Sequence, residues 1–297
     1  MASPEFHAFQ ERMASARQAP PPADLNELRA RIDATMGRLP LAEGTSAKEV
    51  DAGGVRAIVC ARDAAQDDAV LLYFHGGGYR MASALAYRSY GSHLASACKA
   101  RVVLVDYRLA PEHPFPAAVE DAVAAYRWLL DEGTPPNRIV VGGDSAGGGL
   151  TGALLLAAVQ RGLPLPAGGV CLSPWADLTI TAASYDTRKD TDKMFGREAA
   201  LQARSVYLGD HDPTDPLASP VFGDWTGMPP LLIQVGDTES LLDDAARLAS
   251  VASAAGVDVT HHVYPEMPHV WQLNYPAFPE AVDAVNEIAE FIARVTR

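Results

Sequence analysis

Short apolar runs alternate along the chain with longer segments of helical period. The runs occupy residues 70–74, 102–105, 139–141, 170–172 and 231–235, and they have the length and composition of buried strands. Strands that alternate with helices are typical of βαβ units. We therefore expect an α/β fold whose central sheet is mostly parallel and flanked by helices.

Two of the intervening segments show the helical period clearly. The segment that begins at Pro116 places apolar side chains on one face, at Val119, Val123, Tyr126 and Leu130. The last segment of the chain does the same with Val282, Val285, Ile288 and Ile292. We expect both stripes to pack against the sheet.

Two regions do not follow this alternation. Residues 1–40 contain two helix-like pieces separated by Pro20-Pro21-Pro22, and residues 179–225 are polar and irregular although they lie between two predicted strands. The chain therefore divides into an N-terminal segment, 1–40, a first part of the core, 41–178, an insertion, 179–225, and a second part of the core, 226–297.

A glycine-flanked serine follows one of the predicted strands directly. Residues 143–147 read G-D-S-A-G, between the run 138–142 and the helix-compatible stretch 148–160. In this strand-turn-helix context the motif is a nucleophile elbow, and the strained turn at Ser145 needs neighbours without Cβ atoms. The amide of Ala146 and the start of the following helix then point to the place where an oxyanion would form.

A second glycine motif follows an earlier predicted strand. Residues 75–79 read H-G-G-G-Y, and consecutive glycines suggest that main-chain amides approach another group closely. An HGGG loop supplies the second oxyanion donor in lipases and esterases. We therefore assign the amides of Gly76 and Gly77, together with that of Ala146, to an oxyanion hole. His75 is expected to shape this loop.

A base and an acid can be sought downstream of the serine. His269 follows the predicted strand 257–263 and is free to approach Ser145, whereas His261 and His262 alternate within that strand. The loop after the predicted strand 230–236 offers four carboxylates, at Asp237, Glu239, Asp243 and Asp244. The last two are typical of a first helical turn. The residue pattern alone leaves the choice of acid open.

Three ordered motifs resemble those of a known family. They are H-G-G-G-Y at 75–79, Y-R-L-A-P-E-H-P-F-P-A-A at 107–118 and G-D-S-A-G-G at 143–148. With them the chain resembles the bacterial hormone-sensitive-lipase-like esterases of the G-D-S-A-G subgroup, from about Val55 to its C-terminus. The resemblance implies an α/β-hydrolase fold with a helical cap formed by residues 1–40 and 179–225.

The resemblance also implies roles for particular residues. The family's D-P-L-R-D segment aligns with residues 239–243, which makes Glu239 the expected acid and keeps Asp237 as the alternative. In the cap, Tyr185, Met194 and Phe195 are candidates for substrate binding, although each could equally pack the cap onto the core. The loop 107–116 is expected to support the HGGG turn.

The motifs and the resemblance together predict a serine carboxylesterase. With Ser145 as nucleophile, His269 as base and Glu239 as acid, it would hydrolyse short- to medium-chain carboxylic esters through an acyl-serine intermediate. A lactonase or an amidase would use the same triad. A non-catalytic ligand-binding relative is disfavoured because serine, histidine and an acid are all present.

Composition excludes several other classes. A net charge of −13 over 297 residues argues against a nucleic-acid partner. The histidines and three cysteines show no metal-binding spacing, so neither a metal nor a cofactor is expected. No run reaches membrane-spanning length, residues 1–10 do not read as a signal peptide, and Cys60, Cys98 and Cys171 lie in apolar segments. We expect a cytoplasmic protein, and the resemblance implies a homodimer paired near residues 257–263.

Overall fold

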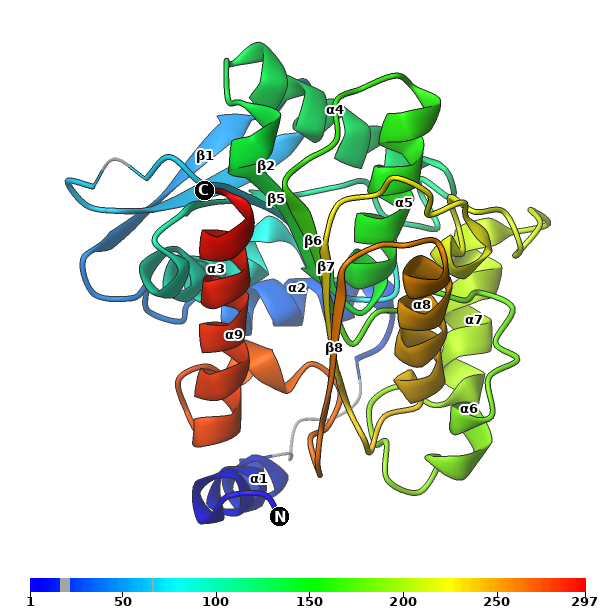
Figure 1. Cartoon of the computed structure of the whole chain (residues 1–297). Coiled ribbons are helices and arrows are strands. Elements are labelled where there is room, and N and C mark those ends of the chain that lie inside the picture. The colour runs from blue at the N-terminus through cyan, green and yellow to red at the C-terminus, as the bar shows by residue number, and fades with distance from the viewer. Residues whose placement is uncertain (17–21, 66) are drawn as a thin grey trace.

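The computed structural model describes residues 1–16, 22–65 and 67–297, so Pro20 and Pro21 of the predicted break lie outside the described residues. Within these ranges one sheet has eight strands in the order β1-β2-β4-β3-β5-β6-β7-β8 (Figure 1). The strands are β1 (Thr45–Asp51), β2 (Arg56–Arg62), β3 (Val70–Phe74), β4 (Arg101–Val105), β5 (Ile139–Asp144), β6 (Gly168–Leu172), β7 (Leu231–Gly236) and β8 (Val259–Tyr264).

The sheet is parallel from β4 to β8 and antiparallel only at its other end, where β2 pairs with β1 and with β4. The five predicted apolar runs are the strands β3 to β7, all with largely buried side chains. The predicted α/β class with a mostly parallel sheet is therefore confirmed.

Helices cover both faces of the sheet. The α-helices are α1 (Pro4–Ala16), α2 (Leu25–Met36), α3 (Ala84–Cys98), α4 (Ala117–Asp131), α5 (Ala146–Gln160), α6 (Ser184–Thr187), α7 (Arg197–Leu208), α8 (Leu242–Ala254) and α9 (Pro279–Val295). Short 3-10 turns lie at η1 (Pro136–Arg138), η2 (Pro220–Phe222) and η3 (Trp271–Asn274). Helices α4, α5 and α8 pack on one face, and α3 and α9 pack on the other (Figure 1).

The two predicted helical stripes face the core with one exception each. Val119, Val123 and Tyr126 of α4 are buried, but Leu129 takes the place expected for Leu130, which is only half-buried. In α9 the half-buried residue is Val282, and the neighbouring small residues Ala281 and Ala284 face inward instead. A helix that packs closely on a sheet rotates to place small side chains at the contact, and apolar periodicity does not encode that rotation.

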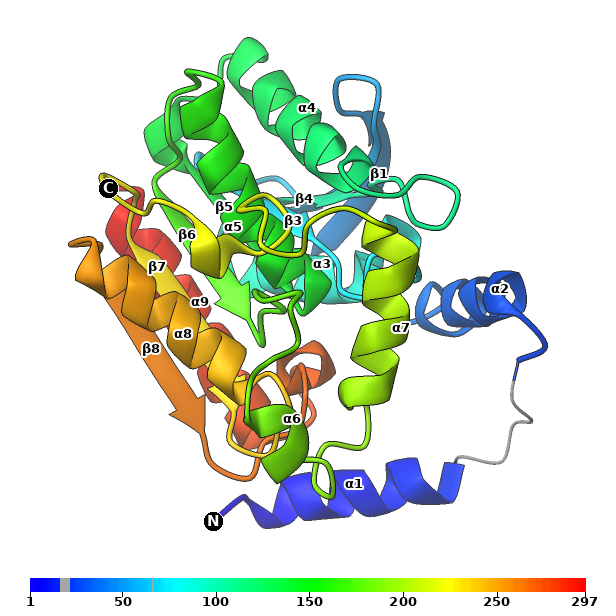
Figure 2. The same cartoon turned by 90° about the vertical axis from the view of Figure 1, so that its right-hand side faces the viewer.

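The register brings the carboxyl ends of the central strands to one edge. Phe74 of β3 is level with Gly143 of β5, and Gly236 of β7 is level with Tyr264 of β8. The loops that follow these strands therefore meet at a single place, which is where ligands bind in open α/β sheets. Figure 2 shows α1 and α6 lying beyond these strand ends, with α7 to one side of them.

The two N-terminal helices are attached to the core by different contacts. Phe6 of α1 packs against Phe278 with 5.1 Å between ring centroids, and the Ser3 hydroxyl donates to Glu280. In α2 the Arg29 guanidinium donates to the carbonyls of Arg80 and Ala110. The second helix thus holds the segment that follows the triple-glycine loop.

Candidate active site

Ser145 lies in the turn between β5 and α5 in a backbone conformation that an L-residue adopts only under constraint. Its φ is 54° and its ψ is −119°. The turn is held from both sides, since its amide donates to the Leu172 carbonyl and its carbonyl accepts from the amide of Trp175. Strain of this kind persists where the surrounding structure fixes it and is common at functional sites.

The glycines on either side of Ser145 are required by close backbone approach. A Cβ atom on Gly143 would lie 2.4 Å from the Gly147 carbonyl oxygen, and one on Gly147 would lie 2.0 Å from that of Phe74. The motif therefore lets the strand, the turn and the helix come together more closely than side chains would permit. This confirms the steric reason inferred from the sequence.

The structure brings Ser145, His269 and Glu239 into one hydrogen-bonded line. His269 Nε2 lies 2.9 Å from Ser145 Oγ, and His269 Nδ1 lies 2.7 Å from Glu239 Oε2. With Nδ1 donating to the carboxylate, Nε2 is left to accept the proton of the serine hydroxyl. This arrangement can deprotonate the serine hydroxyl.

The second oxygen of the Glu239 carboxylate is held by its own donors. Oε1 accepts from the Ser173 hydroxyl at 2.7 Å and from the Gly236 amide at 2.6 Å. Asp237, the alternative acid, points elsewhere and accepts from the amide of Glu266 at 2.7 Å. Of the candidate acids, Glu239 alone contacts the imidazole.

Neighbouring charges and burial shift the pKa of the His269 imidazole in opposite directions. Burial lowers its pKa, whereas the hydrogen bond and charge of Glu239 and the charges of Asp192 and Asp144 raise it, and the net effect is a raised pKa. Surrounding carboxylates therefore favour the imidazolium at a buried position. A base in acyl transfer needs this environment at the moment when it takes up a proton.

The triple-glycine loop corrects one of the predicted oxyanion donors. The Gly76 amide points inward and donates to Asp144 Oδ1 and to the Tyr87 hydroxyl, each at 3.2 Å. A buried amide with these partners is not available to a ligand. The Gly77, Gly78 and Ala146 amides have no hydrogen-bond partner among the described residues. The expectation for Gly76 is therefore wrong, because the chain turns between Gly76 and Gly77, where φ reaches 118°.

The loop after β4 supports the triple-glycine loop, as expected. The Tyr107 hydroxyl donates to the His75 carbonyl at 2.7 Å, and the two rings stack with centroids 4.3 Å apart. The Ala110 amide donates to the Tyr79 carbonyl at 2.9 Å. Glu112 in this loop binds the Arg29 guanidinium, and this bond lowers its pKa to about 2.

The three cap residues expected to bind substrate lie in different surroundings. Phe195 lies over the imidazole of His269, with ring centroids 5.9 Å apart and an angle of 16° between the planes. Tyr185 is fully buried, and the Arg197 guanidinium lies 5.5 Å from its ring centroid. Met194 is 57% exposed. Of these three, only Phe195 contacts a residue of the hydrogen-bonded line.

Aromatic rings form a continuous row from the cap to His269. Tyr79, which ends the glycine motif, stacks on Tyr207 of α7 with centroids 3.8 Å apart and also contacts Trp175. Trp175 meets Phe195 edge-on at 5.2 Å, and Phe195 in turn covers His269. Ser145, beside this row, is only 5% exposed. The row therefore ends on the imidazole that contacts the serine.

Sequence reasoning missed two residues that contact this site. Ser173 supports Glu239, and its position directly after the apolar run 170–172, at the carboxyl end of a parallel strand, was a signal that could have identified it. Asp192 is a buried carboxylate of the cap that accepts from the amide of Ser240, next to Glu239. No motif surrounds Asp192, so the sequence offered no sign of it.

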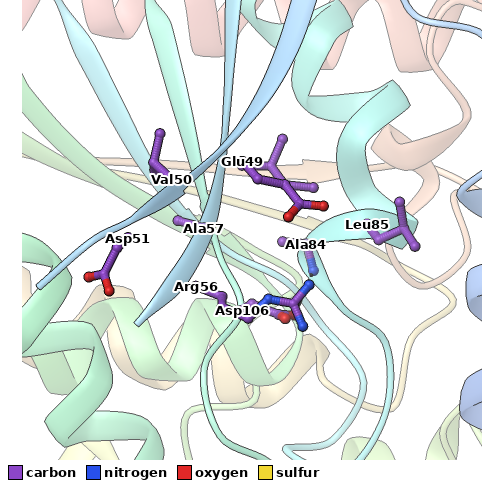
Figure 3. Close-up of a pocket in the computed structure, with 9 residues that line it drawn as sticks. Glu49, Val50, Asp51, Arg56, Ala57, Ala84, Leu85 and Asp106 are labelled. Atoms are coloured by element: carbon purple, nitrogen blue, oxygen red, sulfur yellow. Dashed lines mark hydrogen bonds between the residues drawn. The ribbon is translucent and has the colours of Figure 1, made fainter. Parts of the chain in front are cut away.

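A separate groove lies at the other end of the sheet (Figure 3). It is formed by β1, β2, the start of α3 and the end of β4, and its lining residues are Glu49, Val50, Asp51, Arg56, Ala57, Ile58, Ala84, Leu85 and Asp106. None of the residues around Ser145 contributes to it.

In the part of the chain that the structure describes, no group of three His, Cys, Asp or Glu residues could hold a metal ion, and no helix has the length and apolar character needed to cross a membrane.

Comparison with known proteins gives consistent matches. Residues 71–273 match the model of a family with the alpha/beta hydrolase fold. An acetyl-hydrolase of Streptomyces hygroscopicus is 48% identical over 235 residues, which are 79% of this chain and 79% of that protein. An esterase of Acinetobacter venetianus is 39% identical, covering 75% and 74% of the two chains. The crystal structure of an esterase from the bacterial hormone-sensitive lipase family superimposes with a TM-score of 0.94 at 45% identity, over 100% of each chain.

Proposed function

The chain belongs to the α/β hydrolase fold family, among the hormone-sensitive-lipase-like esterases, and is a serine carboxylic ester hydrolase; we propose that Ser145, His269 and Glu239 perform this hydrolysis. The observation that carries the assignment is the line of hydrogen bonds from Ser145 Oγ through the imidazole to the Glu239 carboxylate, at 2.9 and 2.7 Å. It has the geometry of a nucleophile, a base and a group that orients the base.

The reaction follows from these roles. His269 Nε2 takes the hydroxyl proton as Ser145 Oγ attacks the ester carbonyl carbon, and Glu239 stabilises the imidazolium that forms. The imidazolium then gives the proton to the leaving alcohol, which leaves an acyl-serine. Water, deprotonated by the same imidazole, attacks the acyl-serine and releases the carboxylic acid.

The oxyanion of each tetrahedral intermediate would be bound by main-chain amides. We assign the donors to Gly77, Gly78 and Ala146, because these amides have no other partner among the described residues and flank the serine turn. Ala146 is the first residue of α5, whose N-terminus adds favourable partial charge. One such donor contributes about 10² to 10³ in turnover.

Esters with short to medium acyl chains fit this site best. The aromatic row of Tyr79, Tyr207, Trp175 and Phe195 lies next to Ser145, and the first three of these side chains are fully buried. A long acyl chain would have to displace packed rings. The similarity to a protein named as an acetyl-hydrolase agrees with a small acyl group.

We also propose that two copies of the chain form a dimer and that the protein is cytoplasmic. The edge strand β8 has an unpaired side, and Val263 on it is 37% exposed, which supports pairing of two copies through this strand. Cys60, Cys98 and Cys171 are buried free thiols, which supports a location in the reducing cytoplasm.

Hydrolysis of p-nitrophenyl esters from acetate to palmitate tests the proposal, with Ser145→Ala measured in parallel. We expect activity that is highest for short chains and falls steeply beyond medium ones. The variant should retain the circular dichroism spectrum and unfolding temperature of the wild type and lose turnover by at least about 10³-fold. Undiminished turnover by Ser145→Ala would contradict the role of the serine, and a maximum at palmitate would contradict the proposed acyl size.

A further inference from the structure

Asp192 is a buried carboxylate in the cap, between α6 and α7, and is only 8% exposed. Both of its oxygens are used. Oδ1 accepts from the amides of Met194 and Phe195 at 2.9 and 3.0 Å, and Oδ2 accepts from the amide of Ser240 at 2.8 Å. A carboxylate bound by three amides is fixed in place and stays ionised readily.

These contacts join the two segments that surround the catalytic imidazole. Phe195 lies parallel to the ring of His269, and Ser240 directly follows Glu239, which accepts the hydrogen bond of that ring. A second contact acts in parallel, since the Thr191 hydroxyl donates to the Thr238 carbonyl at 2.9 Å. Asp192 therefore fixes the ring above His269 relative to the loop that carries Glu239.

The charge of Asp192 also acts on His269. The carboxylates around the imidazole come from three elements: Glu239 from the loop after β7, Asp144 from the end of β5 and Asp192 from the cap. Burial opposes ionisation of Asp192, but the amides of Ser240, Phe195 and Met194 and the nearby imidazole outweigh it, and the pKa of Asp192 is lowered. The cap thus contributes a negative charge in addition to that of Glu239.

We propose that Asp192 is a positioning residue for the ester hydrolysis: it holds Phe195 and the Glu239 loop in place around His269, and its charge favours the imidazolium formed when Ser145 attacks. The inference rests on the proposed roles of these residues. It assigns to the cap a part in the chemical step.

Asp192→Asn tests this proposal, and the chain offers two matched controls. Asp190→Asn makes the same change of charge two residues away at an exposed position. Thr191→Val removes the neighbouring contact to Thr238 but keeps the charge. Each variant is measured for kcat and KM on p-nitrophenyl acetate between pH 5 and 9, and for its unfolding temperature.

We expect Asp192→Asn to lower kcat by about 10-fold to 100-fold with a smaller change in KM. The limb of the kcat/KM profile that reports deprotonation of His269 should move to lower pH by about half a unit to one unit, because a neutral neighbour no longer stabilises the imidazolium. Thr191→Val should leave this limb in place, and so should Asp190→Asn, because solvent screens an exposed charge.

The pKa of His269 can also be followed by NMR of its imidazole protons, assigned with His269→Asn, and this readout does not depend on ester hydrolysis. A lower pKa in Asp192→Asn without esterase activity in the wild type would support the inference while contradicting the proposed function. If Asp192→Asn leaves both the pKa of His269 and the limb of the kcat/KM profile unchanged, the inference is overturned. An equal shift of the His269 pKa in Asp190→Asn would also overturn it. If Asp192→Asn does not fold, Asp192→Ser takes its place, and failure of both to fold would identify a residue that the fold itself needs and overturn the positioning role.

Discussion

The carboxylate that accepts from His269 Nδ1 belongs to a glutamate, whose side chain is one methylene longer than that of an aspartate. The extra length is accommodated because Glu239 starts within the turn after β7, where its own amide donates to the Gly236 carbonyl. Its Oε1 is fixed by Ser173 and Gly236, so Oε2 is presented to the imidazole in one orientation. Such fixed support gives a flexible side chain the precision that catalysis needs.

Replacing each candidate acid by its amide separates the two carboxylates. Glu239→Gln keeps the shape but removes the charge that selects the productive imidazole tautomer, so we expect kcat to fall by about 10³ to 10⁴-fold. Asp237→Asn, whose carboxylate binds the Glu266 amide, should stay within a few-fold of the wild type. Steady-state kinetics on p-nitrophenyl acetate distinguish the two candidate acids. Loss of activity in Asp237→Asn with Glu239→Gln intact would reverse the assignment.

Single residues differed in how well the sequence could predict them. Ser145 and His269 each stand in a recognisable context, and the structure brings them together. Glu239 needed the family resemblance, because four carboxylates follow β7 in close succession and spacing does not distinguish them. Gly76 was misassigned because the rotation of the chain at Gly77 is a tertiary property that three identical glycines do not reveal.

At the scale of elements, Asp144 connects the strands to the triple-glycine loop. It ends β5 and accepts from the hydroxyl of Tyr73 on β3 at 2.9 Å and from that of Tyr87 on α3 at 2.8 Å. The Gly76 amide also donates to the Asp144 carboxylate, at 3.2 Å. This single side chain therefore fixes the start of the loop relative to the nucleophile elbow, which explains its place beside Ser145.

Burial of Asp144 predicts a pH dependence of stability. Burial raises its pKa to about 6, although hydrogen bonds from Tyr87 and Tyr73 act in the opposite direction. Because the native state holds this proton more tightly than the unfolded chain, stability from this group is present below the unfolded pKa of about 4 and is lost as the pH rises through about 6.

Asp144→Asn should remove this dependence. We expect the free energy of unfolding of the variant to gain about 2 kcal/mol relative to the wild type between pH 4 and pH 7, at 1.36 kcal/mol per pKa unit. Urea titrations at both pH values measure it, and Asp190→Asn, at an exposed site, should show no such gain. A difference between Asp144→Asn and the wild type that is constant with pH would contradict the raised pKa.

Elements were predictable where burial dominates their composition. Strands β3 to β7 are buried on both faces and appear as continuous apolar runs. Strand β1 was missed because it is exposed or half-buried throughout and reads T-S-A-K-E-V-D, without an apolar run. Strand β2 was also missed, although it contains the apolar stretch A-I-V-C-A and is partly buried. The cap was recognised only as a departure from the pattern, since α6 has four residues and its surroundings carry no period.

For the whole molecule, the arrangement of β8 determines how two copies could meet. The Leu231 amide donates to the Asp258 carbonyl, and the Asp237 amide donates to the Tyr264 carbonyl, at the two ends of the parallel pair with β7. In a parallel pair, alternate residues make both backbone hydrogen bonds to the same neighbour. The even-numbered residues of β8 therefore bind β7, and the amides of Val259, His261 and Val263 face the free edge.

This alternation provides a test of the proposed dimer with two adjacent histidines. His261→Pro removes an outward amide, so it should keep the fold and the esterase activity but convert a dimer into a monomer in size-exclusion chromatography with light scattering. His262→Pro removes an amide that binds β7 and leaves a β7 carbonyl without its donor, so it should instead destabilise the fold by about 1 to 3 kcal/mol. Both changes replace histidine by proline, so composition is matched. His262→Pro also removes side-chain contacts with Glu287 and Tyr264, and His262→Ala measures that loss separately. A dimer that survives His261→Pro unchanged would show that the copies do not pair through β8, and a wild type that is monomeric at all concentrations would remove the dimer altogether.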